Sequence, residues 1–205
     1  MPNYRFSREA IANFFAVLIF PFCIISLEAL LFHLLMIVSN YLHATTIISI
    51  AMFGIAFGGL ISFYMLKLNR IIVLSLWSLV FFISIGLSYF SIVRLDNFTF
   101  PWLLIIPFVA GSVIVSSVFS RADSHKIYFV DLTASAAGVV YPIIAVSMFK
   151  SESTLLILSI LPLIFLIIQI SLLKNIFLKI AGVLIPAAGI GFVLWLLNMN
   201  LNIPG

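Results

Sequence analysis

The sequence predicts an all-α fold, a polytopic bundle of about seven transmembrane helices. Of its 205 residues, 64% are hydrophobic and only 8% are charged, whereas a soluble domain needs roughly 25% charged residues to cover its surface. The charges fall almost entirely at short breaks between apolar runs of about 20 residues, the length that spans a bilayer. Lipid offers no partner for backbone groups, and the runs lack the alternation of barrel strands, so each run should be a helix.

The predicted spans follow one another with short connections, so residues 1–205 are expected to form a single integral membrane domain. No soluble domain of useful size fits between them, and the first apolar run is too long for the core of a cleavable signal peptide. The spans are 12–38, 45–66, 71–93, 101–120, 127–149, 154–173 and 178–197.

The basic residues separate by side of the membrane. Eight of the ten fall on one side: Arg5, Arg8, Lys67, Arg70, Arg121, Lys126, Lys174 and Lys179. Only Arg94 and Lys150 fall on the other. The positive-inside rule then predicts a cytoplasmic N-terminus and an external tail. The expected location is a bacterial plasma (inner) membrane. The basic residues at the membrane borders set this orientation, so the net charge of +4 does not indicate nucleic-acid binding. We expect the lipid bilayer as the partner of these side chains.

The first span carries two polar residues. Glu28 falls near the middle of the bilayer, where a charge costs about 2.5–3.5 kcal/mol on insertion scales. It should be protonated or paired inside the bundle, as a structural acid or as a functional one. His33 lies five residues on, roughly 140° around the helix, so it is on another face. It is either a buried or interfacial polar residue or part of a candidate site.

The second span carries the glycines of a close helix contact. Gly54 and Gly58 form a GxxxG pattern, and Gly59 follows directly. Such spacing lets two helices approach closely. In a polytopic protein, packing inside the bundle is favoured over dimerisation.

Asp131 is the residue around which the candidate site is organised. It places an acid in the otherwise apolar stretch 128–142, and small residues follow as far as Gly138, so a neighbouring helix can approach this segment as well. An ionisable side chain inside a bilayer is a functional-site hypothesis by default.

Four polar positions share one predicted depth. Asp131 lies five residues after Lys126, Gln169 lies five before Lys174, and Ser116 and Ser117 lie five and four before Arg121. At 1.5 Å per residue, each sits roughly 6–8 Å inside the cytoplasmic boundary. The layer is either a ligand pocket open to the cytoplasm or a simpler arrangement in which the helix N-terminus and a serine hold Asp131.

The sequence names no reaction. It has no CxxC, HExxH, P-loop or GxSxG pattern, so no catalytic residue, metal ligand or cofactor is predicted in this chain. Cys23 is the only cysteine, which excludes an internal disulfide.

The chain resembles the N-terminal membrane region of the membrane-associated spermidine synthase-like proteins in three places. Residues 25–33, ISLEALLFH, are similar to that family's first helix, which has a glutamate followed by a hydrophobic run and a basic residue. Residues 53–62, FGIAFGGLIS, are similar to its glycine-rich second helix. Residues 127–138, IYFVDLTASAAG, look like its signature, in which an aspartate-leucine pair precedes small residues ending in glycine.

The resemblance implies a membrane module and supplies no synthase active site. His33 stands where the family usually has arginine, and Ser135 where it usually has glycine. In such proteins a soluble aminopropyltransferase-like domain of Rossmann type, using decarboxylated S-adenosylmethionine, follows the membrane part. A cytosolic domain of this kind conflicts with an external Gly205, unless a span is re-entrant, an eighth helix follows or the domain is extracytoplasmic.

Three functions fit these observations. The first is a membrane module that anchors a soluble synthase-like domain or partner, or supplies substrate to it. The second is a small transporter or channel half that uses Glu28 and Asp131 for a cation or proton. The third is a structural subunit of a membrane complex. An open reading frame that continues beyond codon 205 into a cofactor-binding domain would favour the first.

Overall fold

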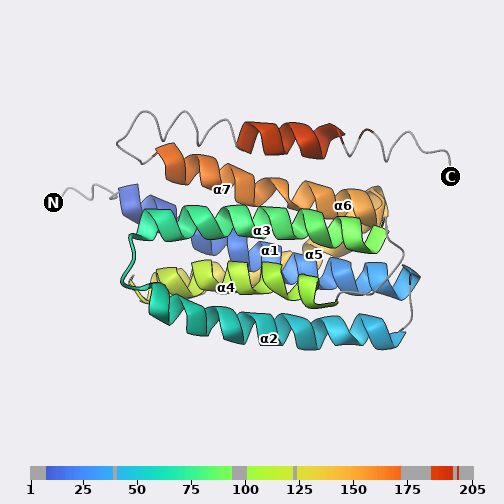
Figure 1. Cartoon of the computed structure of the whole chain (residues 1–205), viewed down its shortest axis with the longest axis horizontal. Coiled ribbons are helices and arrows are strands. Elements are labelled where there is room, and N and C mark those ends of the chain that lie inside the picture. Colours follow the sequence, from blue (N-terminus) through green and yellow to red (C-terminus); the bar gives the residue numbers. More distant parts are fainter. Residues whose placement is uncertain are drawn as a thin grey trace.

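The computed structural model describes residues 8–38, 41–93, 101–121, 124–171, 186–195 and 198, and contains no strand within them. Figure 1 shows the arrangement of the helices. The elements in chain order are α1 (Arg8–Val38), α2 (Tyr41–Met65), α3 (Arg70–Val93), the short 3-10 helix η1 (Pro101–Leu104), α4 (Ile105–Phe119), α5 (Ser124–Met148), α6 (Ser151–Leu158) and α7 (Ile160–Ser171).

Six helical segments are long and apolar enough to cross a membrane, which gives the chain the character of a multi-pass membrane protein and confirms the predicted all-α bundle. The segments are Ala10–Ile37, Tyr41–Met65, Arg70–Ile92, Trp102–Phe119, His125–Met148 and Ser151–Ile170. The predicted seventh span, 178–197, begins outside the described residues. Its described part contains a shorter apolar helix, Pro186–Trp195.

The sixth crossing is made of two helices, although the sequence was expected to form one continuous span over 154–173. α6 ends at Leu158 and α7 begins at Ile160. Pro162 has no N–H, and its ring clashes with the carbonyl four residues earlier, which belongs to Leu158. The break therefore falls where proline removes the helical hydrogen bond. Ser159 remains tied to the end of α6, because its backbone N–H donates to Leu155 and Leu156.

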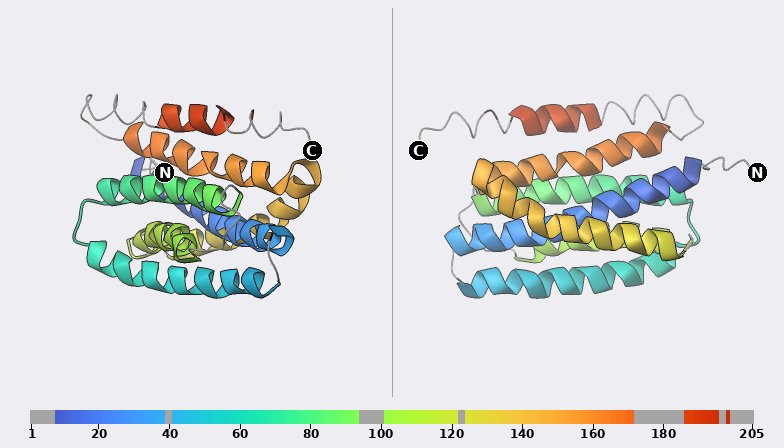
Figure 2. Two further views of the ribbon diagram at one scale, coloured as in Figure 1. Left: turned by 45° about the vertical axis from the view of Figure 1, so that its right-hand side comes forward. Right: turned by 180° about the vertical axis from the view of Figure 1, so that it is seen from behind.

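α1 is the central helix of the bundle. It packs most extensively on α5 and also contacts α2, α4, α6 and α7, while α2 packs mainly on α4, and α3 on α4 and α7. Figure 2 shows α5 beside α1 on the face turned away from the viewer in Figure 1. Phe20, Phe81 and Phe165 join α1, α3 and α7 through edge-to-face contacts of 5.4 and 5.1 Å between ring centroids. All three rings are fully buried, so this aromatic cluster forms part of the core.

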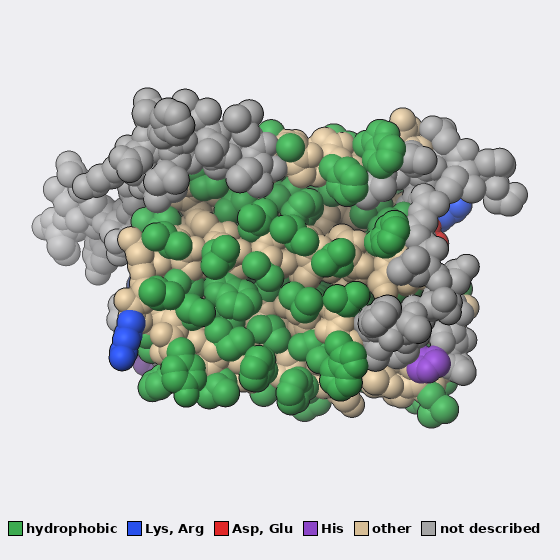
Figure 3. Space-filling view, in the orientation of Figure 1, with side chains coloured by type: hydrophobic (Ala, Val, Ile, Leu, Met, Phe, Trp, Pro, Cys, Tyr) green, Lys and Arg blue, Asp and Glu red, His purple; other side chains and the backbone are tan. Residues whose placement is uncertain are grey.

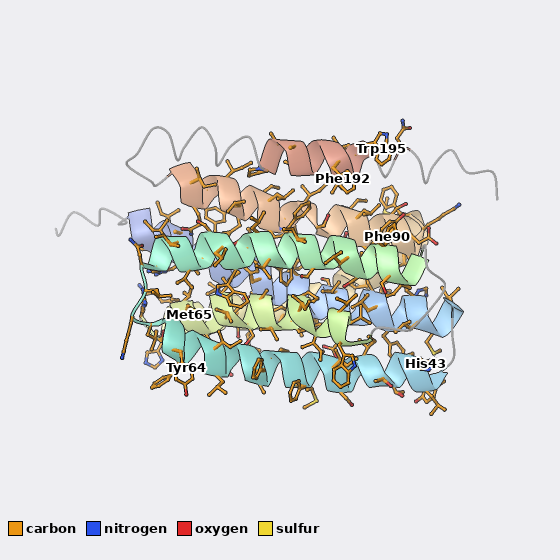
Figure 4. The ribbon with its side chains drawn as sticks, in the orientation of Figure 1. His43, Tyr64, Met65, Phe90, Phe192 and Trp195 are labelled. Atoms are coloured by element: carbon orange, nitrogen blue, oxygen red, sulfur yellow. The ribbon has the colours of Figure 1, made fainter. Side chains whose placement is uncertain are left out.

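The charged side chains visible on the face drawn in Figure 3 lie at the two ends of the bundle, and the surface between them is largely hydrophobic. We call the end that contains Lys67, Arg121 and Lys126 the basic end. There Arg121 donates a hydrogen bond of 2.6 Å to the carbonyl of Leu66 just after α2. Exposed tyrosine and tryptophan residues, which favour membrane interfaces, lie near helix ends; they are Tyr41, Tyr64, Trp102, Tyr128 and Trp195. One of them, Tyr64, is at the opposite end of α2 from His43 (Figure 4).

Glycines allow two close helix contacts. A Cβ on Gly54 would lie 2.7 Å from the Cβ of Phe108, and one on Gly58 would lie 2.5 Å from the carbonyl oxygen of Val109. We call this contact the α2–α4 seam. On the other side of α1, a Cβ on Gly138 would lie 2.7 Å from the carbonyl oxygen of Phe22. The glycines named in the sequence thus face neighbouring helices of the same chain at these three positions.

A serine supplies the hydrogen bond that a proline removes at the contact between α1 and α5. Pro142 lies inside α5 and cannot donate to the carbonyl of Gly138, four residues earlier. Ser26 of α1 donates its hydroxyl to that carbonyl over 3.0 Å. Because hydrocarbon offers no alternative donor, this bond both satisfies α5 and fixes its position on α1.

Candidate functional site: a polar cleft at Asp131

Asp131 lines a cleft of about 230 Å³ between helices α1, α2, α4 and α5. We call it the Asp131 cleft. Its polar lining residues are Ser112, Ser116, Asp131 and Ser135, and its apolar ones are Pro21, Ile24, Ile25, Ile55 and Val115. Asp131 lies seven residues after the start of α5, so at 1.5 Å per residue the cleft is roughly 10 Å from the basic end.

Helical periodicity brings the polar residues together. Asp131 and Ser135 are four residues apart on α5, and Ser112 and Ser116 are four apart on α4, so each pair shares one helix face. Pro21, Ile24 and Ile25 of α1 form the apolar base of the cleft, between the polar faces of α4 and α5. The cleft is therefore built by helices that are distant in the sequence and positioned by α1.

The carboxylate of Asp131 is left available in this cleft. Among the residues that the structure describes, it forms no hydrogen bond and no ion pair. Ser112 is already engaged, since its hydroxyl donates to the carbonyl of Ile55 on α2 over 2.6 Å. The half-buried Ser116 and Ser135 line the same cleft. An acid with hydroxyl neighbours and no internal cation is suited to bind a positively charged group.

We expect the cleft to open toward the side of the bundle, between α2 and α5. α5 packs on α1 and α6, whereas α2 packs on α4 and α1, so the cleft lies between two walls that rest separately on α1. These two walls are the least buried of the six long apolar helices. Only 22% of the 18-residue apolar stretch of α5, and 28% of that of α2, is buried. Ile55 lies at the rim, being both a lining residue and 38% exposed.

Two other residues of the predicted polar layer lie elsewhere. Ser117 is buried beside Ser116 on α4 but does not line the cleft. Gln169 is also fully buried, on α7, which packs on α3 and α1. Its side-chain nitrogen has no hydrogen-bond partner in the described part of the chain. The structure thus brings Ser116 to Asp131 and places Ser117 and Gln169 apart from them.

The two candidate residues of the first span also lie outside the Asp131 cleft. Glu28 is half-buried and lies seven residues after Pro21 and four after Ile24, so it shares their face of α1 about one to two turns farther from the basic end. His33 is exposed, and its Nδ1 lies 3.1 Å from the hydroxyl of Ser151 at the start of α6. His33 is therefore at the end opposite to the basic end.

Ser112 and Ser135 are members of the cleft that were not predicted as site residues. Both could have been found from helical spacing, because each lies one turn from a predicted residue, Ser116 or Asp131. Gly59 borders the cleft, since a Cβ there would lie 3.8 Å from the hydroxyl oxygen of Ser116. Within the described ranges, no group of three or more His, Cys, Asp or Glu side chains could hold a metal ion.

No protein-family model matches this chain, and neither does any curated protein or solved structure.

Proposed function

We propose that the chain is a membrane-embedded module that binds an amine-bearing ligand at Asp131 and supplies it to a soluble synthase-like domain or another subunit. The observation that carries the proposal is the Asp131 carboxylate, which lines a cleft with three serines and has no partner among the described residues. An ammonium group would complete this arrangement, because it brings a positive charge and several hydrogen-bond donors.

The resemblance to the membrane part of spermidine synthase-like proteins supports the same chemistry, since their substrates are amines. In the proposed topology the N-terminus and the basic end are cytoplasmic, in a bacterial plasma membrane. The Asp131 cleft then lies near the cytoplasmic face. A soluble partner that uses the ligand would be reached from that side.

Binding of an amine to the purified protein in lipid nanodiscs tests the proposal. Spermidine serves as a water-soluble probe and dodecylamine as a membrane-soluble one. Asp131→Asn should remove binding of whichever amine the wild type takes up, because the amide keeps the shape of the side chain but not its charge. Glu152→Gln is the matched control, since it removes an acid of α6 that does not line the cleft. The proposal fails if the wild type binds neither amine, or if Asp131→Asn binds as well as the wild type.

A second function, passage of a cation or proton, is favoured by the position of Glu28. This acid shares a face of α1 with the floor of the cleft, so two carboxylates at different depths lie along one side of the central helix. Vesicles that contain only this chain would then show cation- or proton-dependent uptake. Loss of that uptake in both Glu28→Gln and Asp131→Asn would support transport, whereas amine binding without uptake would leave the first function in place.

A further inference from the structure

We infer that the ligand of the Asp131 cleft is a membrane-soluble amphiphile, whose ammonium group reaches Asp131 from the bilayer while its hydrocarbon chain lies between α2 and α5. This inference rests on the proposed amine-binding function and adds the ligand class and the route of entry.

The size of the cleft is the first reason. Its volume is about 230 Å³, whereas pockets that enclose a whole small molecule usually measure about 300–1,000 Å³. The cleft is therefore large enough for the polar end of a ligand, and the remainder must lie outside. The outside of this part of the bundle is formed by exposed apolar side chains.

The distribution of polarity is the second reason. Asp131 and the serines lie on α4 and α5, and the rest of the lining is aliphatic. Next to the cleft, Leu132 of α5 is 53% exposed and Met52 of α2 is 68% exposed. A ligand with a charged end and a hydrocarbon chain matches this arrangement. Its charged end would contact the carboxylate, and its chain would contact the exposed apolar side chains of α2 and α5.

The separation of the walls is the third reason. α5 is held to α1 by the bond from Ser26 to Gly138 and by the close approach of Gly138 to Phe22. α2 is held to α4 by the glycines of the α2–α4 seam and by the bond from Ser112 to Ile55. Each wall is thus fixed from its inner side, and we expect the cleft between them to open toward the bilayer.

The experiment uses the full chain in nanodiscs and dodecylamine that carries a photoreactive diazirine near its amine. After illumination, mass spectrometry locates the modified peptides. We expect modification of peptides that contain Ile25, Ile55 or Ser135. Dodecanol with the same diazirine should modify them much less, because it brings no charge. Asp131→Asn should lower modification by the amine about tenfold, the effect of losing about 1.4 kcal/mol of binding.

Ile55→Trp tests the route of entry, since a large ring at the rim would close the cleft from the bilayer. It should lower modification by the dodecylamine probe. Ile48→Trp is the control, because Ile48 is 42% exposed on the same face of α2, two turns away, and does not line the cleft. It should leave the modification unchanged.

The same diazirine on butylamine separates the two proposals. One outcome is that butylamine modifies the cleft as strongly as dodecylamine, with Ile55→Trp changing the extent of modification by neither amine. That result would show entry from water, which overturns the inference and leaves the proposed amine binding in place. If Asp131→Asn changes the modification by neither amine, the proposed function fails together with the inference.

Discussion

The α2–α4 seam and the Asp131 cleft are neighbours that share Ser112, but one is closed and the other is open. Gly58 and Gly59 are adjacent on α2, yet a Cβ would lie 2.5 Å from a backbone oxygen of α4 at the first and 3.8 Å from a serine hydroxyl at the second. Ser112 takes part in both regions, as a neighbour of Gly58 and as a lining residue of the cleft.

The difference shows how the bundle keeps a polar space in an apolar surrounding. Where backbones meet over glycine, no room remains for lipid, water or a ligand. Where Asp131 and the serines face one another, no side chain from a neighbouring helix fills the space between them. The contacts that close the seam also fix α2, one wall of the cleft, against α4, so the closed region positions the open one.

Gly58→Leu should have the largest effect on the α2–α4 seam. The new side chain would meet the carbonyl of Val109 and the side chain of Ser112, and overpacking of this kind costs about 3 kcal/mol or more. Thermal unfolding in detergent measures the loss. Gly86→Leu is the matched control, because nothing lies within 4 Å of a Cβ at that position. Equal melting temperatures for the two variants would show that the seam is not closed as described.

Gly138→Ala should have a smaller but clear effect at the contact between α1 and α5. A methyl group there would lie 2.7 Å from the carbonyl oxygen of Phe22, so we expect a loss of about 1–3 kcal/mol. Gly59→Ala, beside the open cleft, should be neutral or stabilising by up to about 1 kcal/mol, because alanine favours helix more than glycine does. The unfolding midpoints of the two variants are measured in the same detergent. A lower midpoint for Gly59→Ala than for Gly138→Ala would contradict the description of a closed contact at Gly138 and an open cleft beside Gly59.

Ser26→Ala should cost about 1 kcal/mol, since it leaves the carbonyl of Gly138 without a donor. The cost should fall in a Pro142→Ala background, where residue 142 regains an N–H that can donate to the same carbonyl. A double-mutant cycle measures this coupling free energy. Strict additivity would show that Ser26 does not replace the bond that Pro142 removes.

The sequence predicted the helices better than it predicted the site. Apolar runs of membrane-spanning length have few alternatives in lipid, so six helical segments follow from length alone. The break at Ser159 was missed, although Pro162 carries the signal for it. Counting from the basic residues gave the depth of Asp131 and Ser116, and these two do share a cleft.

Depth is only one coordinate, and the remaining differences come from the direction around each helix and from which helices are neighbours. Ser117 lies one residue from Ser116 but about 100° around α4, and it is turned away from the cleft. Gln169 has a similar predicted depth but belongs to α7, which packs on α3 and α1. Which helices become neighbours depends on tertiary packing, and no local pattern in this sequence specifies it.

A cysteine placed at Ser135 gives the most direct measurement of the open cleft. Cys23, the only native cysteine, is fully buried, so an introduced thiol would be the main site of reaction with N-ethylmaleimide. The reaction requires the thiolate, so modification shows that water reaches the polar end of the cleft, from whichever side the hydrocarbon chain of the ligand enters. We expect that Ser135→Cys is modified in nanodiscs and that dodecylamine slows the modification. Ala134→Cys, at a buried neighbouring position, should stay unmodified. A Ser135→Cys thiol as unreactive as that of Ala134→Cys would contradict the existence of an accessible polar cleft at Asp131.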